Sequence, residues 1–365
     1  VQHKMIKNWV SFLLLVRGFD SFITRSPQIN AQRKIITMEL APFKRSRTQN
    51  VPGNLFVDES CIDCDVCRWM CPNVYGRKGI KSAVITQPKT TSDKLQAYAA
   101  MVACPVGSIR TVVSDPLVKQ VLSDVFPAEI DPIRIPGVMH LGFHSPLSYG
   151  ATPYMIRRPG GNVMIDSPRF NSKLADNIES QGGLALIILT HKDDVADHLK
   201  WKARFPSAQR VIHRADVTRE SSGCEVLLEG SGPWTPFTAG DVTIHHTPGH
   251  TAGSLCILYS PQSVNNINGI ESPSSEAVLF TGDHVGYSVE RGLLDGFKSY
   301  NHGNVLAQLQ SIELLQEWDF LWVLPGHGRM IRFESLEEKN ENILRAVEYF
   351  KRDDESFGML NIGYR

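Results

Sequence analysis

Short apolar runs that end in polar residues recur along the chain from about residue 138 onward. In the clearest of them, residues 184–189 contain only Leu, Ala and Ile, follow a Gly-Gly pair and end at Thr190. A short apolar run bounded by turn residues is typical of a strand buried on both faces. The same pattern predicts strands at residues 138–143, 154–157, 162–165 and 320–324, and helical spacing predicts helices at residues 171–181 and 304–317. We therefore expect residues 134–350 to form a layered domain of strands and helices.

The front of the chain is patterned differently. Residues 93–102 and 117–125 have the apolar spacing of helices, and prolines at 116 and 132 bracket the second of them. These features divide the chain into a leader at 1–53, a first domain at 54–113, a linker at 114–133, the layered domain at 134–350 and a tail at 351–365. We expect the linker helix to pack across both domains.

Charge is balanced over the whole chain but not at its start. The 38 basic and 38 acidic residues give a formal net charge of zero, so no overall field attracts nucleic acid or an anionic membrane. Residues 1–53 nevertheless carry nine Lys or Arg and only two acids, as organellar transit peptides do, although a solvated tail is the alternative. Their apolar run at 9–16 is too short to span a bilayer. We expect an intracellular protein without a membrane span, in a plastid or another organelle and not secreted.

Five of the seven cysteines fall between Cys61 and Cys104. Cys61, Cys64, Cys67 and Cys71 form a C-x2-C-x2-C-x3-C-P run, and a lone Cys-Pro follows at Cys104. Such close spacing suits an iron–sulfur loop better than a set of disulfides, whose geometry demands specific separations between the paired residues. Reduced, unpaired thiols also agree with an intracellular compartment.

This run resembles that of bacterial-type ferredoxins, over about residues 53–113. The cysteines provide a full set of ligands for only one cluster, because no C-x2-C-x2-C run precedes Cys104. The resemblance to single-cluster ferredoxins implies an α+β domain with a 4Fe-4S cluster on Cys61, Cys64, Cys67 and Cys104. Cys71 is then left over, as a buried free thiol or a remnant of a lost second cluster.

Imidazoles and carboxylates gather directly after the strand-like runs. His191, Asp193, Asp194, Asp197 and His198 lie within eight residues after the strand at 184–190. Such a collection of nitrogen and oxygen donors is a metal-site signature, although Asp193 or Asp194 could instead cap a helix at 195–205. Three further donors follow later apolar runs in similar fashion, in the order His250, Asp283 and His327.

The order of these four segments resembles that of the metallo-β-lactamase superfamily, over roughly residues 135–350. The resemblance implies an αββα sandwich with metal ligands His191, Asp193, Asp197, His198, His250, Asp283 and His327. It also implies that Asp283 bridges two metals and that Asp197 and Asp283 are catalytic.

The first segment departs from the superfamily's H-x-H-x-D-H. Asp193 stands where the second histidine is expected from His191, and two extra residues precede Asp197 and His198. A carboxylate in place of an imidazole favours a harder metal, so one or two ions of iron are expected before zinc or manganese. Flavodiiron proteins, the iron-using branch of the superfamily, also place an acid there. Asp166 matches the superfamily's early strand-end acid, which more often orders a loop than binds metal.

Two modules of this kind lead to one favoured hypothesis and two alternatives. The favoured one is an enzyme, a metallo-oxidoreductase whose 4Fe-4S cluster relays electrons to a non-haem metal site. The first alternative is a metal-dependent hydrolase of thioesterase or glyoxalase II type with a structural or sensing cluster, in which Asp197 positions or deprotonates a metal-bound water. The second is a non-catalytic iron–sulfur interaction or assembly protein. A small-molecule substrate and a redox-partner protein are the expected partners.

Overall fold

The computed structural model describes residues 45–261, 275–301 and 303–352. The predicted leader up to residue 44, residues 262–274, residue 302 and the tail from 353 lie outside them. Residues 44–365 form one compact unit by their internal contacts. No helix of the described ranges is both long and apolar enough to cross a membrane.

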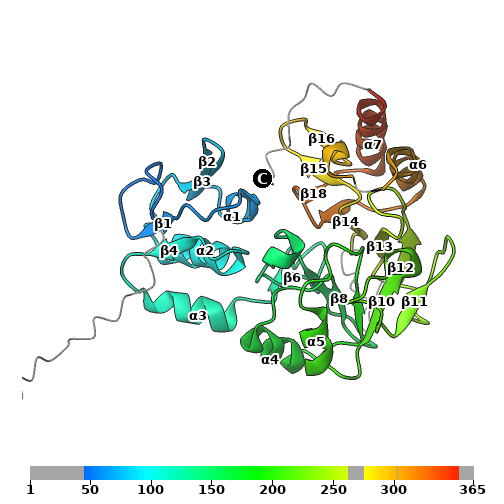
Figure 1. Ribbon diagram of the computed structural model, residues 1–365, viewed down its shortest axis with the longest axis horizontal. Coiled ribbons are helices and arrows are strands. Elements are labelled where there is room, and N and C mark those ends of the chain that lie inside the picture. Colours follow the sequence, from blue (N-terminus) through cyan, green and yellow to red (C-terminus); the bar gives the residue numbers. More distant parts are fainter. Residues whose placement is uncertain (1–44, 262–274, 302, 353–365) are drawn as a thin grey trace, which may run out of the picture. The chain divides into compact units, whose positions relative to one another are not determined.

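The first module is a small α+β domain (Figure 1). Strand β1 (Leu55–Val57) pairs antiparallel with β4 (Ile109–Thr111), and β2 (Tyr75–Lys78) forms a hairpin with β3 (Lys81–Val84). Helix α1 (Val66–Met70) lies inside the cysteine run, and α2 (Thr91–Ala103) packs against it. Thr90 and Asp93 form a capping box that fixes the start of α2, and Cys104 caps its end, so the helix delivers this cysteine as its spacing predicts.

The charge pattern assigned residues 45–53 to the leader, but the structure packs them onto the first module. Arg47 is buried and donates hydrogen bonds to the carbonyls of Ser82 and Lys78. Asn50 donates to the carbonyl of Val57 at 2.8 Å. Arg47, which the charge pattern assigned to the leader, is therefore a hydrogen-bond donor in the interior of the first module.

Helix α3 (Pro116–Asp124) connects the modules and contacts both α2 and α4 (Ser172–Ser180). Asp115 caps its start and also accepts hydrogen bonds from Lys94 and Tyr98 of α2. At its other end, Asn177 of α4 donates to the carbonyls of Ser123 and Phe126, at 2.7 and 2.9 Å. The linker helix is thus fixed to each module by side-chain hydrogen bonds.

The second module contains a seven-stranded and a five-stranded sheet. The larger has the order β11-β10-β9-β8-β7-β6-β5, and the smaller has the order β12-β13-β14-β17-β18. The strands of the larger sheet are β5 (Ala128–Glu129), β6 (Val138–His140), β7 (Tyr154–Ile156), β8 (Val163–Ile165), β9 (Leu186–Ile188), β10 (Gln209–His213) and β11 (Val226–Leu228). Those of the smaller are β12 (Val242–His246), β13 (Leu255–Tyr259), β14 (Val278–Gly282), β17 (Trp322–Pro325) and β18 (Ile331–Arg332). Strand β5 comes from the end of the predicted linker.

Buried side chains define four layers. Ile165 and Ile188 of the larger sheet meet Ile257 and Phe280 of the smaller one in a core between the sheets. The outer face of the larger sheet packs with α4 and α5 (His198–Arg204). The outer face of the smaller sheet packs with α6 (Val305–Leu314) and α7 (Leu336–Lys351) (Figure 1). The module is therefore an αββα sandwich, because each sheet buries one face against the other sheet and one against helices.

Candidate metal centre

Strand register brings the polar strand ends together. Strands β14 and β17 are parallel with Gly282 opposite Pro325, so the residues that follow, Asp283 and His327, leave the sheet at the same edge. The backbone N–H of Leu255, at the start of β13, donates to the carbonyl of Thr190 at 2.9 Å. That bond ties the end of β9, which carries His191, to the smaller sheet beside the turn that carries His250.

Three imidazoles surround one oxygen of Asp283. The Nε2 atoms of His191, His250 and His327 lie 3.6, 3.7 and 3.6 Å from its Oδ2 atom. All three histidines are buried, and burial lowers the pKa of His327 to about 4. Neutral imidazoles next to a carboxylate are the form in which histidine binds a metal.

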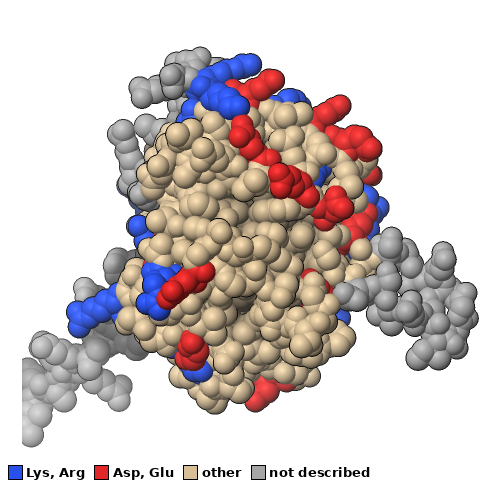
Figure 2. Space-filling model, turned by 90° about the vertical axis from the view of Figure 1, so that its right-hand side faces the viewer, with Lys and Arg blue, Asp and Glu red and all other residues tan. Residues whose placement is uncertain are grey.

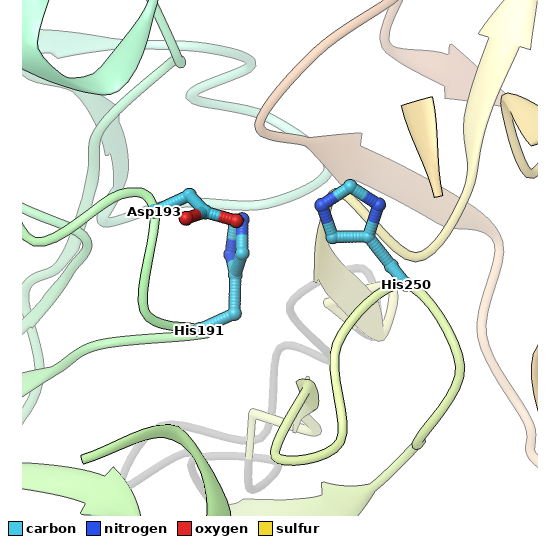
Figure 3. Close-up of side chains that lie close together, drawn as sticks. All are labelled: His191, Asp193 and His250. Atoms are coloured by element: carbon cyan, nitrogen blue, oxygen red, sulfur yellow. The ribbon is translucent and has the colours of Figure 1, made fainter. Parts of the chain in front are cut away.

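Asp193 completes one group of possible ligands. Ligand atoms of His191, Asp193 and His250 all lie within 4.8 Å of one another. Figure 3 shows the Asp193 carboxylate beside the His191 ring, with the His250 ring facing them across a gap. The carboxylate of Asp193, two residues after His191, therefore lies at the site.

Asp194 belongs to a second group, with His191 and Asp283. It is 1% exposed, and neither of its carboxylate oxygens has a hydrogen-bond partner among the described residues. Burial, together with the nearby Asp283 and Asp166 carboxylates, raises the pKa of Asp194 well above its usual value. The sequence pattern included Asp194 among the possible donors, with a helix cap as the alternative, but the resemblance did not assign it as a ligand. Its place directly after Asp193 at a strand end is the signal that could have identified it.

These donors fit a metal centre. Ligands about 2.0–2.2 Å from one ion lie roughly 3–4 Å from each other, which is the spacing found around Asp283. A buried carboxylate without a hydrogen-bond partner, such as that of Asp194, is costly unless a cation or proton neutralises it. Three imidazoles and three carboxylates supply both nitrogen and oxygen ligands for such an ion. The six residues are His191, Asp193, Asp194, His250, Asp283 and His327.

The structure places Asp197 and His198 elsewhere. Val195 and Ala196 form a turn, with Ala196 at a φ of 36°, and this turn carries the next two residues into α5. Asp197 accepts hydrogen bonds from the backbone N–H of Phe170 at 2.8 Å and from Lys200 at 2.9 Å. The Nδ1 atom of His198 lies 3.4 Å from the Arg210 guanidinium. Burial and this arginine lower the pKa of His198 to about 4.

Two buried aspartates support the metal-site loops without belonging to either ligand group. Asp216, at the end of a short 3-10 helix (Arg214–Asp216), accepts from the N–H groups of Lys192 at 3.1 Å and Gly253 at 2.8 Å, and so joins the His191 loop to the His250 loop. Asp166 accepts from the N–H and hydroxyl of Thr190, at 2.8 and 2.9 Å, as expected of a loop-ordering acid. Asp216 could not be identified from the sequence, because its partners, two backbone N–H groups and the Thr251 hydroxyl, lie on distant loops.

A glycine leaves room for the carboxylates. A Cβ atom on Gly326 would lie 2.7 Å from an oxygen of Asp283 and 3.2 Å from one of Asp194. The Pro-Gly-His turn therefore requires glycine at residue 326, because a larger residue would collide with the two carboxylates.

The cysteine site is more compact. Cys61, Cys64, Cys67 and Cys104 line one cavity together with Val57, Ile62 and Val66. Burial raises the pKa of Cys67 to about 12. Burial also raises the pKa of Cys64 well above its usual value, with the neighbouring Cys104 thiol adding to the effect. Four converging thiols in an apolar pocket fit an iron–sulfur cluster, whose iron ions would stabilise the thiolates. Cys71 is buried at the end of α1 and does not line this cavity.

A cavity of about 350 Å³ lies beside both sites. Its wall includes Cys64 of the cluster pocket and His327 of the metal site. Asp65 and Arg329, one from each module, form an ion pair on its rim. The other residues that line it are Arg68, Arg77, Tyr287, Ser288, Val289, Glu290 and Gly328.

The face drawn in Figure 2 has acidic side chains gathered toward one side and few basic ones on the remainder. The described residues of that face therefore form no broad basic surface of the kind that nucleic-acid binding needs.

The fold and sites define a two-module protein, with a cysteine-rich α+β domain before an αββα sandwich that carries an imidazole–carboxylate site. Residues 57–111 match the family model "4Fe-4S single cluster domain of Ferredoxin I". The prediction of a single-cluster 4Fe-4S domain is thus confirmed. The comparison with curated proteins finds no match to this chain.

Among solved structures, the chain is similar to metallo-β-lactamases. TMB-1, studied for its substrate and inhibitor binding, is 19% identical, with 54% of this chain and 86% of that chain covered at a TM-score of 0.40. The metallo-β-lactamase of Hirschia baltica is 16% identical, with 55% and 85% covered at a TM-score of 0.38. That of Pontibacter korlensis is 15% identical, with 53% and 87% covered at a TM-score of 0.40.

Proposed function

We propose that this protein is a ferredoxin-fused metallo-oxidoreductase, in which a 4Fe-4S cluster relays electrons to a non-haem metal site, with iron as the favoured metal. One observation carries the proposal: Cys64 and His327 line the same cavity. Because a cluster ligand and a metal ligand line the same cavity, the two centres are close enough for an electron to pass between them. A hydrolase has no need of such a transfer.

The residues divide the task. Cys61, Cys64, Cys67 and Cys104 hold the cluster, which supplies one electron at a time at low potential. Asp283, whose Oδ2 atom lies near three imidazoles, would be the carboxylate shared between two ions if both were bound. Asp193 and Asp194 supply the additional negative charge that stabilises a more highly charged ion.

The cavity provides for a small-molecule substrate. Asp65 pairs with both Arg68 and Arg329, so this ion-pair chain holds the cluster loop against the His327 turn. A substrate in the cavity would lie against Cys64 and His327 together.

The hydrolase alternative needs a base, and the contacts of Asp197 do not favour that role. Asp197 was its expected base, yet its two oxygens accept from Phe170 and Lys200. A hydrolytic reaction would have to use Asp193 or Asp194 in that role.

Metal analysis of the anaerobically purified full-length chain tests the proposal. The expected result is iron in excess of the cluster's sulfide-matched share, together with a second iron species in the Mössbauer spectrum that dithionite reduces. Zinc in the second module, with hydrolysis that ignores the redox state of the cluster, would support the hydrolase instead. A metal-free second module would support the non-catalytic alternative.

A further inference from the structure

Two buried histidines lie outside the metal site. His140 ends β6 and His144 follows four residues later, at 5% and 0% exposure. Their Nε2 atoms lie 2.8 Å apart, and apolar core residues such as Phe126 and Phe143 surround them. Burying polar rings in such a core costs free energy that apolar side chains would not. The pair therefore needs an explanation beyond packing.

The pair fixes a backbone segment that touches the cluster pocket. His144 Nδ1 lies 2.8 Å from the carbonyl oxygen of Gly150. Gly150 has a φ of 86°, and a Cβ atom there would lie 3.2 Å from Cys64 Cβ and 3.1 Å from Pro105. The backbone of Gly150 thus packs directly on a cluster ligand and on the residue after Cys104.

The same segment reaches the metal site two residues later. The N–H of Thr152 donates to the carbonyl of Gly326 at 2.8 Å, and Gly326 precedes the metal-site residue His327. Tyr154 donates its hydroxyl to the neighbouring carbonyl of Pro325 at 2.7 Å. A short covalent segment with one hydrogen bond therefore leads from the contact with Cys64 to His327.

We propose that the segment from Gly150 to Thr152 is the electron bridge between the cluster and the metal site, and that His144 is a positioning residue that holds Gly150 against Cys64. This inference rests on the proposed function. One electron leaves the reduced cluster, which becomes oxidised, and a ferric ion at the imidazole–carboxylate site becomes ferrous. No covalent bond breaks, and His144 itself is neither oxidised nor reduced.

The variants follow from the hydrogen bond. His144→Leu removes the bond to Gly150, whereas His144→Asn retains a side-chain N–H that can donate to the same carbonyl. Gly150→Ala places a methyl group against Cys64 and strains a left-handed backbone position. Asn162→Leu is the matched control, because Asn162 is also buried and donates to the carbonyl of a glycine, Gly183, that has a φ of 70°.

The experiment uses the full chain loaded with iron, with the cluster reduced by dithionite in a stopped-flow instrument. Cluster reoxidation is followed by its visible absorbance, and ferric reduction by freeze-quench EPR. We expect electron transfer to slow several-fold in His144→Leu and Gly150→Ala, at unchanged cluster content and midpoint potential. His144→Asn should restore most of the rate, and Asn162→Leu should leave it unchanged.

The outcomes separate the two proposals. If the wild-type cluster never reduces the second metal, the proposed function fails. If it does, and His144→Leu and Gly150→Ala transfer electrons at the wild-type rate, the bridge is overturned while the proposed function stands. Equal slowing in His144→Leu and Asn162→Leu would likewise overturn it, because a general loss of packing would then explain both. Should His144→Leu fail to fold, His144→Asn and Gly150→Ala still decide the question.

Discussion

The two sites are built in opposite ways. Three of the cluster cysteines lie between Cys61 and Cys67, on one loop around α1, and only Cys104 is brought in by a helix. The imidazole–carboxylate site instead takes residues from four separate strand ends, between His191 and His327. The first is a local property of the sequence, whereas the second exists only once two sheets have packed together.

This difference predicts different responses to mutation. A loop site tolerates changes elsewhere but depends entirely on each of its few ligands. A site assembled by the fold has supporting residues, such as Asp216, whose loss changes its affinity by degrees.

The largest effect is expected at Cys104. Cys104→Ser should abolish the 4Fe-4S cluster, because a single-cluster domain has no spare thiolate in its cavity. Cys71→Ser is the control, and it should retain the cluster because Cys71 does not line that cavity. Sulfide content and the visible spectrum measure both. A cluster in Cys104→Ser, or none in a folded Cys71→Ser, would break the assignment.

Asp283→Asn should empty the second site and leave the cluster intact. The substitution removes the charge that three imidazoles share, so the loss of metal affinity should exceed the ~10–100-fold that supporting residues cause. Metal content after dialysis against a weak chelator, compared with sulfide content, gives the result. Retention of the second metal would contradict the geometry.

Asp216→Asn should have an intermediate effect. It weakens hydrogen bonds from Lys192 and Gly253, which hold the His191 and His250 loops, and should lower metal affinity by ~10–100-fold. A competitive titration with a chromophoric chelator measures the change. An unchanged affinity would show that the two loops hold their places without it.

Asp197→Asn sharpens the comparison, because the superfamily pattern and the structure disagree about this residue. The structure predicts unchanged metal content and a loss of about 1 kcal/mol in the free energy of unfolding, from the weakened bond to Phe170. Urea unfolding and metal analysis decide. Loss of the metal would favour the superfamily pattern over the placement seen here.

Glu225→Gln should have the smallest effect. Burial alone would raise the pKa of Glu225, but hydrogen bonds from Arg210 and Lys202 outweigh it and lower the pKa to about 2. A depressed carboxyl pKa adds stability above the unfolded value of 4.5, and this is lost as the pH falls toward 2. The variant should lose below about 1 kcal/mol at neutral pH, and less under acid conditions, with metal content unchanged. An acid-unfolding series checks this.

Much of the fold was predictable from local pattern. The capped helix before Cys104, the linker helix and the strands around residues 138–165 lie within a few residues of their predicted positions. Residues 45–53 were misassigned, because a basic composition does not distinguish a leader from an arginine that bonds buried carbonyls.

The metal site was predictable in part. Spacing placed His191, His250, Asp283 and His327 at strand ends, and the structure brings their side chains together. The spacing could not predict where the residues after Asp193 lie, because a single turn at Ala196 determines which carboxylates face the site. Asp194 lies among the possible ligands, whereas Asp197 lies at the start of α5. Because both residues are aspartates, the backbone geometry and not the residue type determines this difference.

Helix α3 has a consequence for engineering. Because its ends are fixed to α2 and α4, it acts as a rigid spacer rather than a tether. Adding one turn would lengthen it by ~5.4 Å. Such an insertion would break the hydrogen bonds at one of its ends, or else the ion pair between Asp65 and Arg329 and the packing of Gly150 on Cys64. The length of this helix and the separation of the two centres therefore cannot be changed independently of each other.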